Sequence, residues 1–150
     1  MASPSIIKAG IPVSLSGEFQ IQGRQALAGL QSWADYVNRS GGIYLGYRGP
    51  RAQVSVIHHD DCSKPLQAKR VTETLIKQDR VDLLFGPYSG VLSLAAAQVA
   101  ESQHRLIWNQ GGATDDIYQQ GYRWVVGILT PASQYLTGLL PLVREVDPGA

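Results

Sequence analysis

Short apolar runs alternate along the chain with segments in which apolar residues recur at helical spacing. The runs have the length of strands and predict strands at residues 6–15, 52–60, 81–86, 105–109 and 123–129. A helix is predicted after each of the first three runs, because apolar positions recur there every three or four residues. The pattern therefore predicts a strand–helix rhythm that continues to about residue 129.

Residues that favour helix ends mark where these helices begin and stop. Gly41 and Gly42 supply a left-handed stop for the first helix, and Ser63 is predicted to be the N-cap of the second. The third helix is predicted to begin after Ser89 and Gly90 and to run to about residue 103.

The rhythm favours a parallel sheet, because parallel neighbours need a crossover and right-handed crossovers place helices on the sheet. The predicted fold class is α/β, an open doubly wound parallel sheet. After Thr130 and Pro131 the alternation of strands and helices stops. A last apolar helix is predicted at residues 132–147, and no strand follows it. This helix contains Pro141. Proline costs about 3 kcal/mol in a helix interior unless it lies at a kink. We therefore expect an incomplete sheet and a sequence that is a fragment.

Composition places the chain among globular proteins and removes several classes of partner. Of its 150 residues, 44% are hydrophobic and 17% are charged, and the net charge is +1. Lys and Arg residues are scattered, so neither nucleic acid nor an anionic membrane is an expected partner. No apolar run is long enough to span a bilayer, and the first residues lack the features of a secretory signal. The protein is expected to be cytosolic, or exported and represented here without its signal.

The turn GPYSG, at residues 86–90, lies between a predicted strand and a predicted helix. Its serine is one residue too far from the first glycine for a nucleophile elbow, and no lysine follows Gly90 as a phosphate loop requires. The dinucleotide fingerprint Gly-x-Gly-x-x-Gly is missing at every such turn. A helix N-terminus would still favour an anionic group such as a carboxylate. Ser89 either adds a hydroxyl donor or only caps the helix, and both roles stay open.

The sequence HHDDC, at residues 58–62, places five potential metal ligands in a row. Successive residues of a strand point to opposite faces, so at most alternate ones converge, and no second cluster accompanies them. We therefore predict neither a metal nor another cofactor. A small α/β hydrolase that uses Ser89 or this cluster stays as an alternative.

Polar, glycine-rich turns also follow the first and fourth predicted strands, at residues 14–23 and 109–116. Open α/β sheets bind ligands at the carboxyl ends of their strands, where all three turns lie. Taken in order with HHDDC, these motifs resemble the type 1 periplasmic binding proteins of the branched-chain amino-acid (Leu/Ile/Val) class. Proteins of this class are the solute receptors of ABC importers, and the resemblance extends over nearly the whole chain.

The resemblance implies a non-enzymatic receptor that clamps a small molecule between two α/β lobes and presents it to an ABC permease. It assigns residues 1–129 to the N-terminal ligand-binding lobe, and residues 130–150 to a hinge crossing and the first helix of the second lobe. The implied location is periplasmic or extracellular. Because most of the second lobe is not in the sequence, we expect the chain to bind ligand weakly or not at all. We also expect the incomplete sheet to leave an apolar face that pairs with either another copy or a swapped element. A sensor module of a signalling receptor is the alternative with the same fold.

The resemblance also implies where an amino acid would be held. Its carboxylate would meet a serine and N–H groups after the third strand, and its ammonium and carboxylate would meet a carbonyl and a threonine after the fourth. The first turn would form the wall of the cleft. The matching positions are Ser89, Gly90, Gly112, Ala113, Thr114, Phe19 and Gln22.

The sequence departs from this class in two ways. Members often pair a cysteine after the second strand with one after the third, whereas Cys62 is the single cysteine here. The ligand-binding serine of the class matches either Ser89 or Gly90, so a serine hydroxyl at that position is not assured. Asp115 and Asp116 are expected to cap a helix rather than to bind the ligand.

Overall fold

The alternation of strands and helices is present in the computed structural model, which describes residues 5–47, 49–147 and 149. The elements, in chain order, are β1 (Ser5–Val13), α1 (Gln20–Arg39), β2 (Ile43–Tyr44), β3 (Arg51–Asp60), α2 (Pro65–Lys77), β4 (Leu83–Phe85), α3 (Gly90–Ser102), β5 (Ile107–Asn109), α4 (Asp116–Gln119), β6 (Val125–Gly127), the 3-10 helix η1 (Ala132–Gln134) and α5 (Leu139–Val146). All five predicted strands are therefore present, although β4 and β5 are only three residues long.

The strands form one sheet in the order β2-β3-β1-β4-β5-β6. β1 pairs in parallel with β3 and β4, and the parallel pairing continues through β5 to β6. β2 is antiparallel to β3 and was not predicted. It is a two-residue strand that follows Gly41 and Gly42, both of which have the positive φ angles that reverse the chain there.

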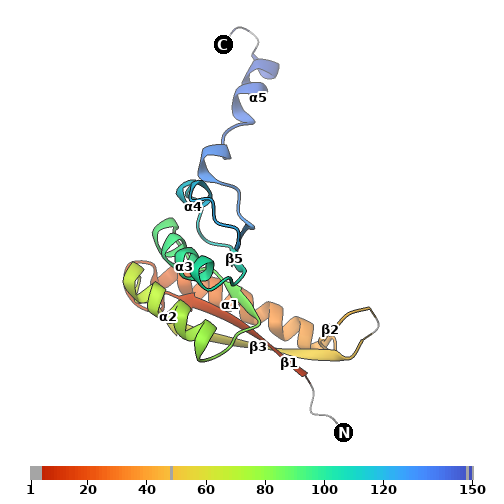
Figure 1. Cartoon of the computed structure of the whole chain (residues 1–150). Helices are drawn as coiled ribbons and strands as arrows, with labels where there is room; N and C mark the ends of the chain where they lie inside the picture. The colour runs from red at the N-terminus through yellow and green to blue at the C-terminus, as the bar shows by residue number, and fades with distance from the viewer. Residues whose placement is uncertain (1–4, 48, 148, 150) are drawn as a thin grey trace.

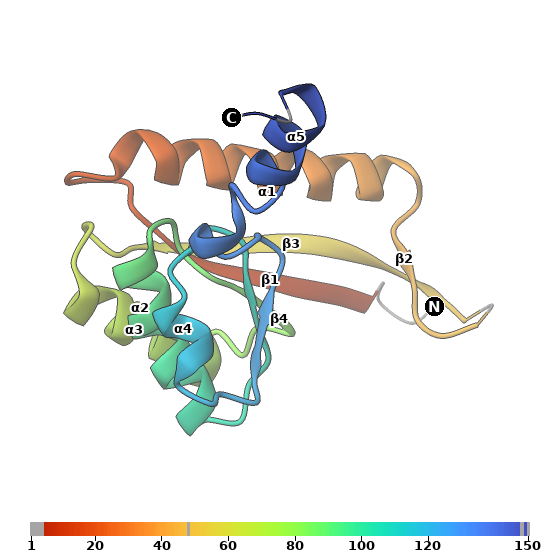
Figure 2. The same cartoon turned by 90° about the horizontal axis from the view of Figure 1, so that it is seen from above.

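Helices cover both faces of the sheet, so the predicted doubly wound α/β class is confirmed. α1 lies along one face of β1 and β3, and α2 and α3 lie on the other face (Figure 2). Ile11 and Val13 of β1 pack with Leu27 of α1. Gly10 points to the opposite face, where a Cβ atom would lie 2.6 Å from Cγ1 of Val81. This alternation along β1 is what allows both layers of helices to pack closely on the sheet.

Ser63 is not the N-cap of the second helix, so that prediction is wrong. Lys64 is the N-cap residue of α2, and Pro65 occupies the first helical position, where its missing N–H costs no hydrogen bond. Ser63 has a φ angle of 55°, and its hydroxyl accepts a hydrogen bond from the backbone N–H of Phe19. A contact distant in sequence therefore replaces the local cap.

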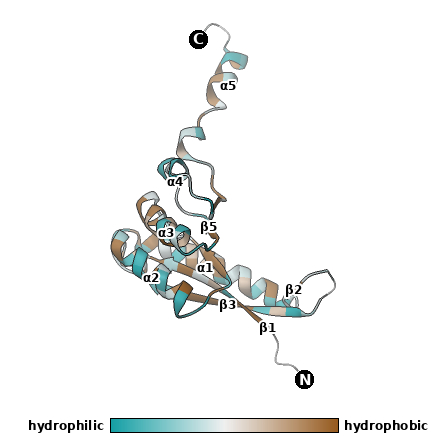
Figure 3. Ribbon diagram, viewed as in Figure 1, coloured by the Kyte–Doolittle hydropathy of each residue, from teal (hydrophilic) through white to brown (hydrophobic). Residues whose placement is uncertain are grey.

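The C-terminal segment differs from the single helix predicted at residues 132–147. The structure has η1, then a turn, then α5, and Pro141 lies in the first turn of α5 where proline is tolerated. α5 extends away from the sheet (Figure 1), and none of its residues is buried. Its exposed surface includes hydrophobic residues (Figure 3). Pro148 and Ala150, which belong to the predicted second part of the chain, lie outside the described residues.

Candidate functional site

Three turns meet at the carboxyl edge of the sheet, because β1, β4 and β5 are parallel neighbours. They are the β1–α1 turn (residues 14–19), the β4–α3 turn (residues 86–89) and the β5–α4 turn (residues 110–115). Tyr88 forms a β-bridge with Gly111, and the backbone N–H of Ser89 donates to the Gly111 carbonyl at 3.0 Å. The rings of Phe19 and Tyr88 are 5.8 Å apart in an edge-to-face arrangement. The structure thus brings the three predicted turns together.

The β4–α3 turn presents the N-terminus of α3. Ser89 is the N-cap residue, and its hydroxyl accepts a hydrogen bond from the backbone N–H of Leu92 at 3.4 Å. Within the described residues, no acceptor faces the N–H groups of Gly90 and Val91. The Ser93 hydroxyl donates to the Pro87 carbonyl and is buried. Two free N–H donors at the positive end of the helix dipole suit an anion.

Gly90 packs directly against Thr114 of the β5–α4 turn. A Cβ atom on Gly90 would lie 2.8 Å from Cγ2 and 2.9 Å from Cβ of Thr114. The Thr114 side chain therefore fills the space that a serine side chain at position 90 would need. The Thr114 hydroxyl has no hydrogen-bond partner in the part of the chain that the structure describes.

Asn109 shapes the β5–α4 turn, a role that was not predicted from the sequence. The residue is 2% exposed, its Nδ2 donates to the Gly112 carbonyl at 2.7 Å, and its Oδ1 accepts from the Gly112 N–H at 3.0 Å. Nδ2 also donates to the Tyr118 hydroxyl. An asparagine at the end of a predicted strand, two residues before a pair of glycines, was the available signal, because asparagine side chains often bond to nearby backbone groups in turns.

The same turn is tied to η1 by two further contacts. The backbone N–H of Ala132 donates to the Ala113 carbonyl at 2.7 Å, and the Ser133 hydroxyl donates to Asp115 at 2.6 Å. Asp115 is the N-cap residue of α4 but makes no side-chain cap there. The carbonyls of Gly112 and Ala113 thus each already accept one hydrogen bond and keep one lone pair.

Phe19 and Gln22 lie on either side of the start of α1. Phe19 packs against Ala68 of α2 and against Leu92 and Ala95 of α3. The Oε1 atom of Gln22 is buried and has no partner among the described residues. A buried amide without a partner costs free energy, which a bound ligand could recover by hydrogen bonding to it.

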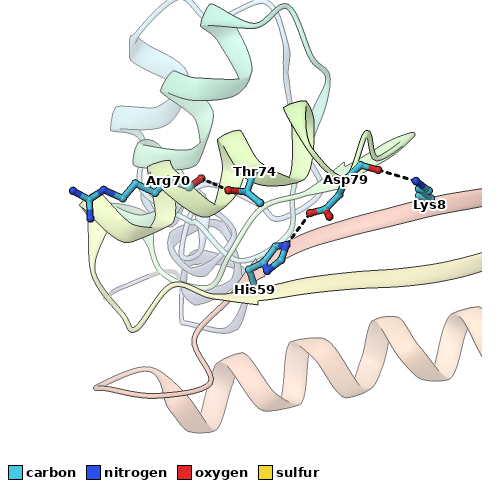
Figure 4. A network of polar contacts seen from close by, with 5 residues as sticks. All are labelled: Lys8, His59, Arg70, Thr74 and Asp79. Atoms are coloured by element: carbon cyan, nitrogen blue, oxygen red, sulfur yellow. Dashed lines mark hydrogen bonds and ion pairs between the residues drawn. The ribbon is translucent and has the colours of Figure 1, made fainter.

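The histidines and aspartates of the HHDDC segment lie in different surroundings. His58 is exposed, whereas Nε2 of His59 lies 2.7 Å from Oδ2 of Asp79, just after α2 (Figure 4). Asp60 and Asp61 face the β1–α1 turn instead. Among residues 5–47, 49–147 and 149, no group of three or more His, Cys, Asp or Glu side chains is placed to hold a metal ion.

The two carboxyl groups have opposite pKa shifts. Burial raises the pKa of Asp60, but hydrogen bonds from Ser16, Cys62 and Leu15 together lower it below the usual value for aspartate. For Asp61, burial dominates and raises the pKa above the usual value, although bonds from Ser14 and Ser63 act against it.

A helix N-terminus flanked by two polar turns at the carboxyl edge of a doubly wound sheet is an arrangement in which α/β domains commonly bind ligands. The sequence model of the family described as "Periplasmic binding protein" matches residues 6–148. The chain therefore belongs to the periplasmic binding protein family. Within the described residues, no helix has the length and hydropathy to cross a membrane.

Relatives and solved structures agree with this assignment. The "Leu/Ile/Val-binding protein homolog 8" of Brucella abortus is 27% identical over 144 residues, which are 95% of this chain and 34% of the relative. The branched-chain amino acid transporter substrate binding protein LivJ from Streptococcus pneumoniae, in complex with isoleucine, is 24% identical with a TM-score of 0.75. That match covers 91% of this chain and 39% of LivJ.

A second solved structure carries a different ligand. It is the solute binding protein of an ABC transporter from Rhodopseudomonas palustris BisB5 in complex with 3,4-dihydroxy benzoic acid, 21% identical with a TM-score of 0.76. The match covers 95% of this chain and 37% of that protein. Similarity to the two solved structures supports the fold, and the chain spans about a third of the length of the curated relatives it matches.

Proposed function

We propose that this chain is the carboxylate-holding lobe of a solute-binding protein of an ABC importer. Its ligand is an amino acid or a related small carboxylate, held in a cleft between this lobe and a second one. The observation that carries the proposal is the pair of free N–H groups of Gly90 and Val91 at the N-terminus of α3. These donors bind a carboxylate without a charged side chain, through hydrogen bonds and the helix dipole.

The neighbouring turns supply the remaining contacts. The Thr114 side chain lies beside Gly90 through its Cβ and methyl carbons, and in this proposal its hydroxyl donates to the same carboxylate. The Gln22 amide and the Phe19 ring form the wall. The carbonyls of Gly112 and Ala113 accept from a ligand ammonium through their second lone pairs. In this scheme Ser89 caps the helix whose N–H groups hold the ligand.

The ligands of the solved relatives are consistent with this division of roles. Isoleucine and 3,4-dihydroxy benzoic acid share a carboxylate and little else. A turn that binds only the carboxylate would accept both ligands. This lobe would therefore supply the carboxylate contact, and the rest of the cleft would determine which side group is accepted.

The proposal extends to the whole protein. Residues 1–129 form the ligand-binding lobe, and residues 130–150 form a hinge crossing and the start of a second lobe. The protein works in the periplasm or outside the cell and presents its closed form to an ABC permease. Closure of the two lobes adds contacts that one lobe alone lacks.

An NMR titration of the chain with L-isoleucine and with 3,4-dihydroxybenzoate tests this proposal. We expect saturable shifts of the Gly90, Val91 and Thr114 amide signals. The Leu66 amide at the start of α2 is the internal control, because Pro65 removes one donor from that helix N-terminus. Thr114→Ala should weaken binding about tenfold or more, as expected for a hydrogen bond to a charged group. Equal shifts at both helix starts, or none at Gly90 and Val91, would contradict the proposal.

A further inference from the structure

Asp60, at the end of β3, is bonded to the β1–α1 turn through both of its carboxylate oxygens. Oδ1 accepts from the backbone N–H groups of Leu15 at 2.9 Å and Cys62 at 2.8 Å. Oδ2 accepts from the Ser16 hydroxyl at 2.7 Å. The Asp60 carboxylate thus joins the end of β3 to residues of the β1–α1 turn that lie 44 and 45 positions earlier in the sequence.

The β3–α2 turn (residues 61–64) adds a second set of bonds to the same neighbour. Oδ1 of Asp61 accepts from the Ser14 hydroxyl at 2.6 Å and from the Ser63 N–H at 2.8 Å. The Ser63 hydroxyl donates to the Ser16 carbonyl at 2.8 Å and accepts from the Phe19 N–H at 3.0 Å. The β1–α1 turn is therefore held along its length, from Ser14 to Phe19.

The last of these bonds ends at the candidate site. Phe19 is the N-cap residue of α1, and its ring contacts Tyr88 of the β4–α3 turn. Gln22 lies three residues further, in the first turn of the same helix. Fixing the Phe19 backbone therefore fixes both the aromatic wall and the start of the helix that carries Gln22.

The β3–α2 turn contains costly features that stability alone does not require. Asp61 is completely buried, and its Oδ2 has no partner among the described residues. Cys62 and Ser63 both have positive φ angles, of 54° and 55°, which non-glycine residues adopt at a cost. Gly17 fits against them, because a Cβ atom there would lie 2.8 Å from the Cys62 carbonyl. Such strain is typical of segments whose geometry serves a site.

We propose that Asp60, Asp61 and Ser63 are positioning residues for ligand binding: they hold the β1–α1 turn so that Phe19 and Gln22 face the N-terminus of α3. The proposal rests on the function proposed above. It gives a role to the HHDDC segment, whose acidic residues bind no metal in our interpretation and contact no ligand.

Ser63→Ala tests the proposal, because it removes the acceptor of the Phe19 N–H and the donor to Ser16 and leaves the volume nearly unchanged. Ser102→Ala is the matched control, since its hydroxyl also bonds a backbone carbonyl, that of Val99, at the far end of α3. Two quantities are measured for each variant: amide hydrogen exchange of residues 14–22, and affinity for L-isoleucine and 3,4-dihydroxybenzoate by NMR titration. Asp60→Asn is a second variant that keeps the shape and one carbonyl oxygen of the side chain.

We expect Ser63→Ala to speed exchange at residues 14–22 and to weaken binding about fivefold, while exchange in α3 stays at the wild-type rate. Asp60→Asn should show a smaller effect of the same kind. Exchange and affinity equal to those of Ser102→Ala would overturn the proposal, and so would loosening spread evenly over the whole chain. If the wild-type chain binds neither probe, the proposed function fails, and the exchange measurement alone decides whether Asp60, Asp61 and Ser63 hold the β1–α1 turn.

Discussion

The β3–α2 turn and the β4–α3 turn occupy the same edge of the sheet, and each leads into a helix of 13 residues. They differ in how their polar groups are used. Around the β3–α2 turn, side chains and N–H groups bond to the β1–α1 turn, and proline removes a donor from the start of α2. The β4–α3 turn keeps two N–H donors without an acceptor in the described structure.

The hydrogen bonds distinguish a turn that supports its neighbour from a turn that binds a ligand. The amino-acid composition of the two turns does not. Both turns are rich in small and polar residues, and the β3–α2 turn, with its histidines and aspartates nearby, has the more reactive side chains. The groups left unbonded, rather than the groups present, indicate where a ligand belongs.

The largest effect on stability is expected at Asp60, the last residue of β3, just before the β3–α2 turn. Asp60→Ala removes the acceptor of three hydrogen bonds, two of them from backbone N–H groups. We expect the free energy of unfolding to fall by about 3 kcal/mol in urea denaturation, since bonds to a charged group are among the strong ones. Asp116→Ala, at an exposed carboxylate, should change it by about 0.5 kcal/mol or less. An equal fall in the free energy of unfolding in the two variants would contradict the supporting role of Asp60.

A smaller effect on stability, but a marked one on binding, is expected for Gly90→Ala. The new Cβ atom would lie 2.8 Å from Cγ2 of Thr114, so the Thr114 side chain must move away from the N–H donors. We expect about a tenfold loss of affinity, equivalent to about 1.4 kcal/mol, in the NMR titration. Gly29→Ala is the control, because nothing lies within 4 Å of a Cβ atom there. It should leave binding unchanged and stabilise α1 by up to about 1 kcal/mol.

The fold could be predicted largely from the sequence because its signals are local. Apolar runs and helical periodicity located the five main strands and the first three helices. β2 was missed because a strand of two residues has no periodicity to detect. Ser63 was assigned wrongly because cap preference is a local rule, whereas its hydroxyl is bonded to Phe19, 44 residues away.

The candidate site was predictable only in outline. Parallel strands bring their carboxyl ends together, so the meeting of the three turns followed from the predicted topology. The packing of Gly90 on Thr114 and the bonded carbonyl of Ala113 depend on contacts between segments that are distant in the sequence. A single sequence contains no signal for such contacts.

Ser89→Ala separates the two roles that the sequence left open for this serine. Because its hydroxyl accepts from the Leu92 N–H, we expect a loss of about 1 kcal/mol in unfolding free energy and no change in affinity. Ser89→Gly should cost less, since the φ angle of 79° at this position suits glycine. A loss of affinity in Ser89→Ala with normal affinity in Gly29→Ala would show that the hydroxyl reaches the ligand.

The smallest effect is expected in how stability depends on pH. The pKa of Asp61 is raised in the folded state because the carboxyl group is buried, so between its usual value and the raised value the folded chain binds more protons than the unfolded chain. The contribution of Asp61 to stability is therefore greatest below its unfolded pKa and falls as pH rises through the folded one. Asp60, with a lowered pKa, acts in the opposite direction and contributes stability that is lost only in more acidic solution.

Asp61→Asn removes this titration and keeps an oxygen for the bonds from Ser14 and Ser63. Comparing unfolding free energies of the variant and the wild type from pH 4 to pH 7 should therefore give a difference that moves in favour of the variant as pH rises. A difference that stays constant with pH would mean that the buried carboxyl group titrates normally. In that event the unpartnered Oδ2 of Asp61 would not be one of the costly features that distinguish the β3–α2 turn from the β4–α3 turn.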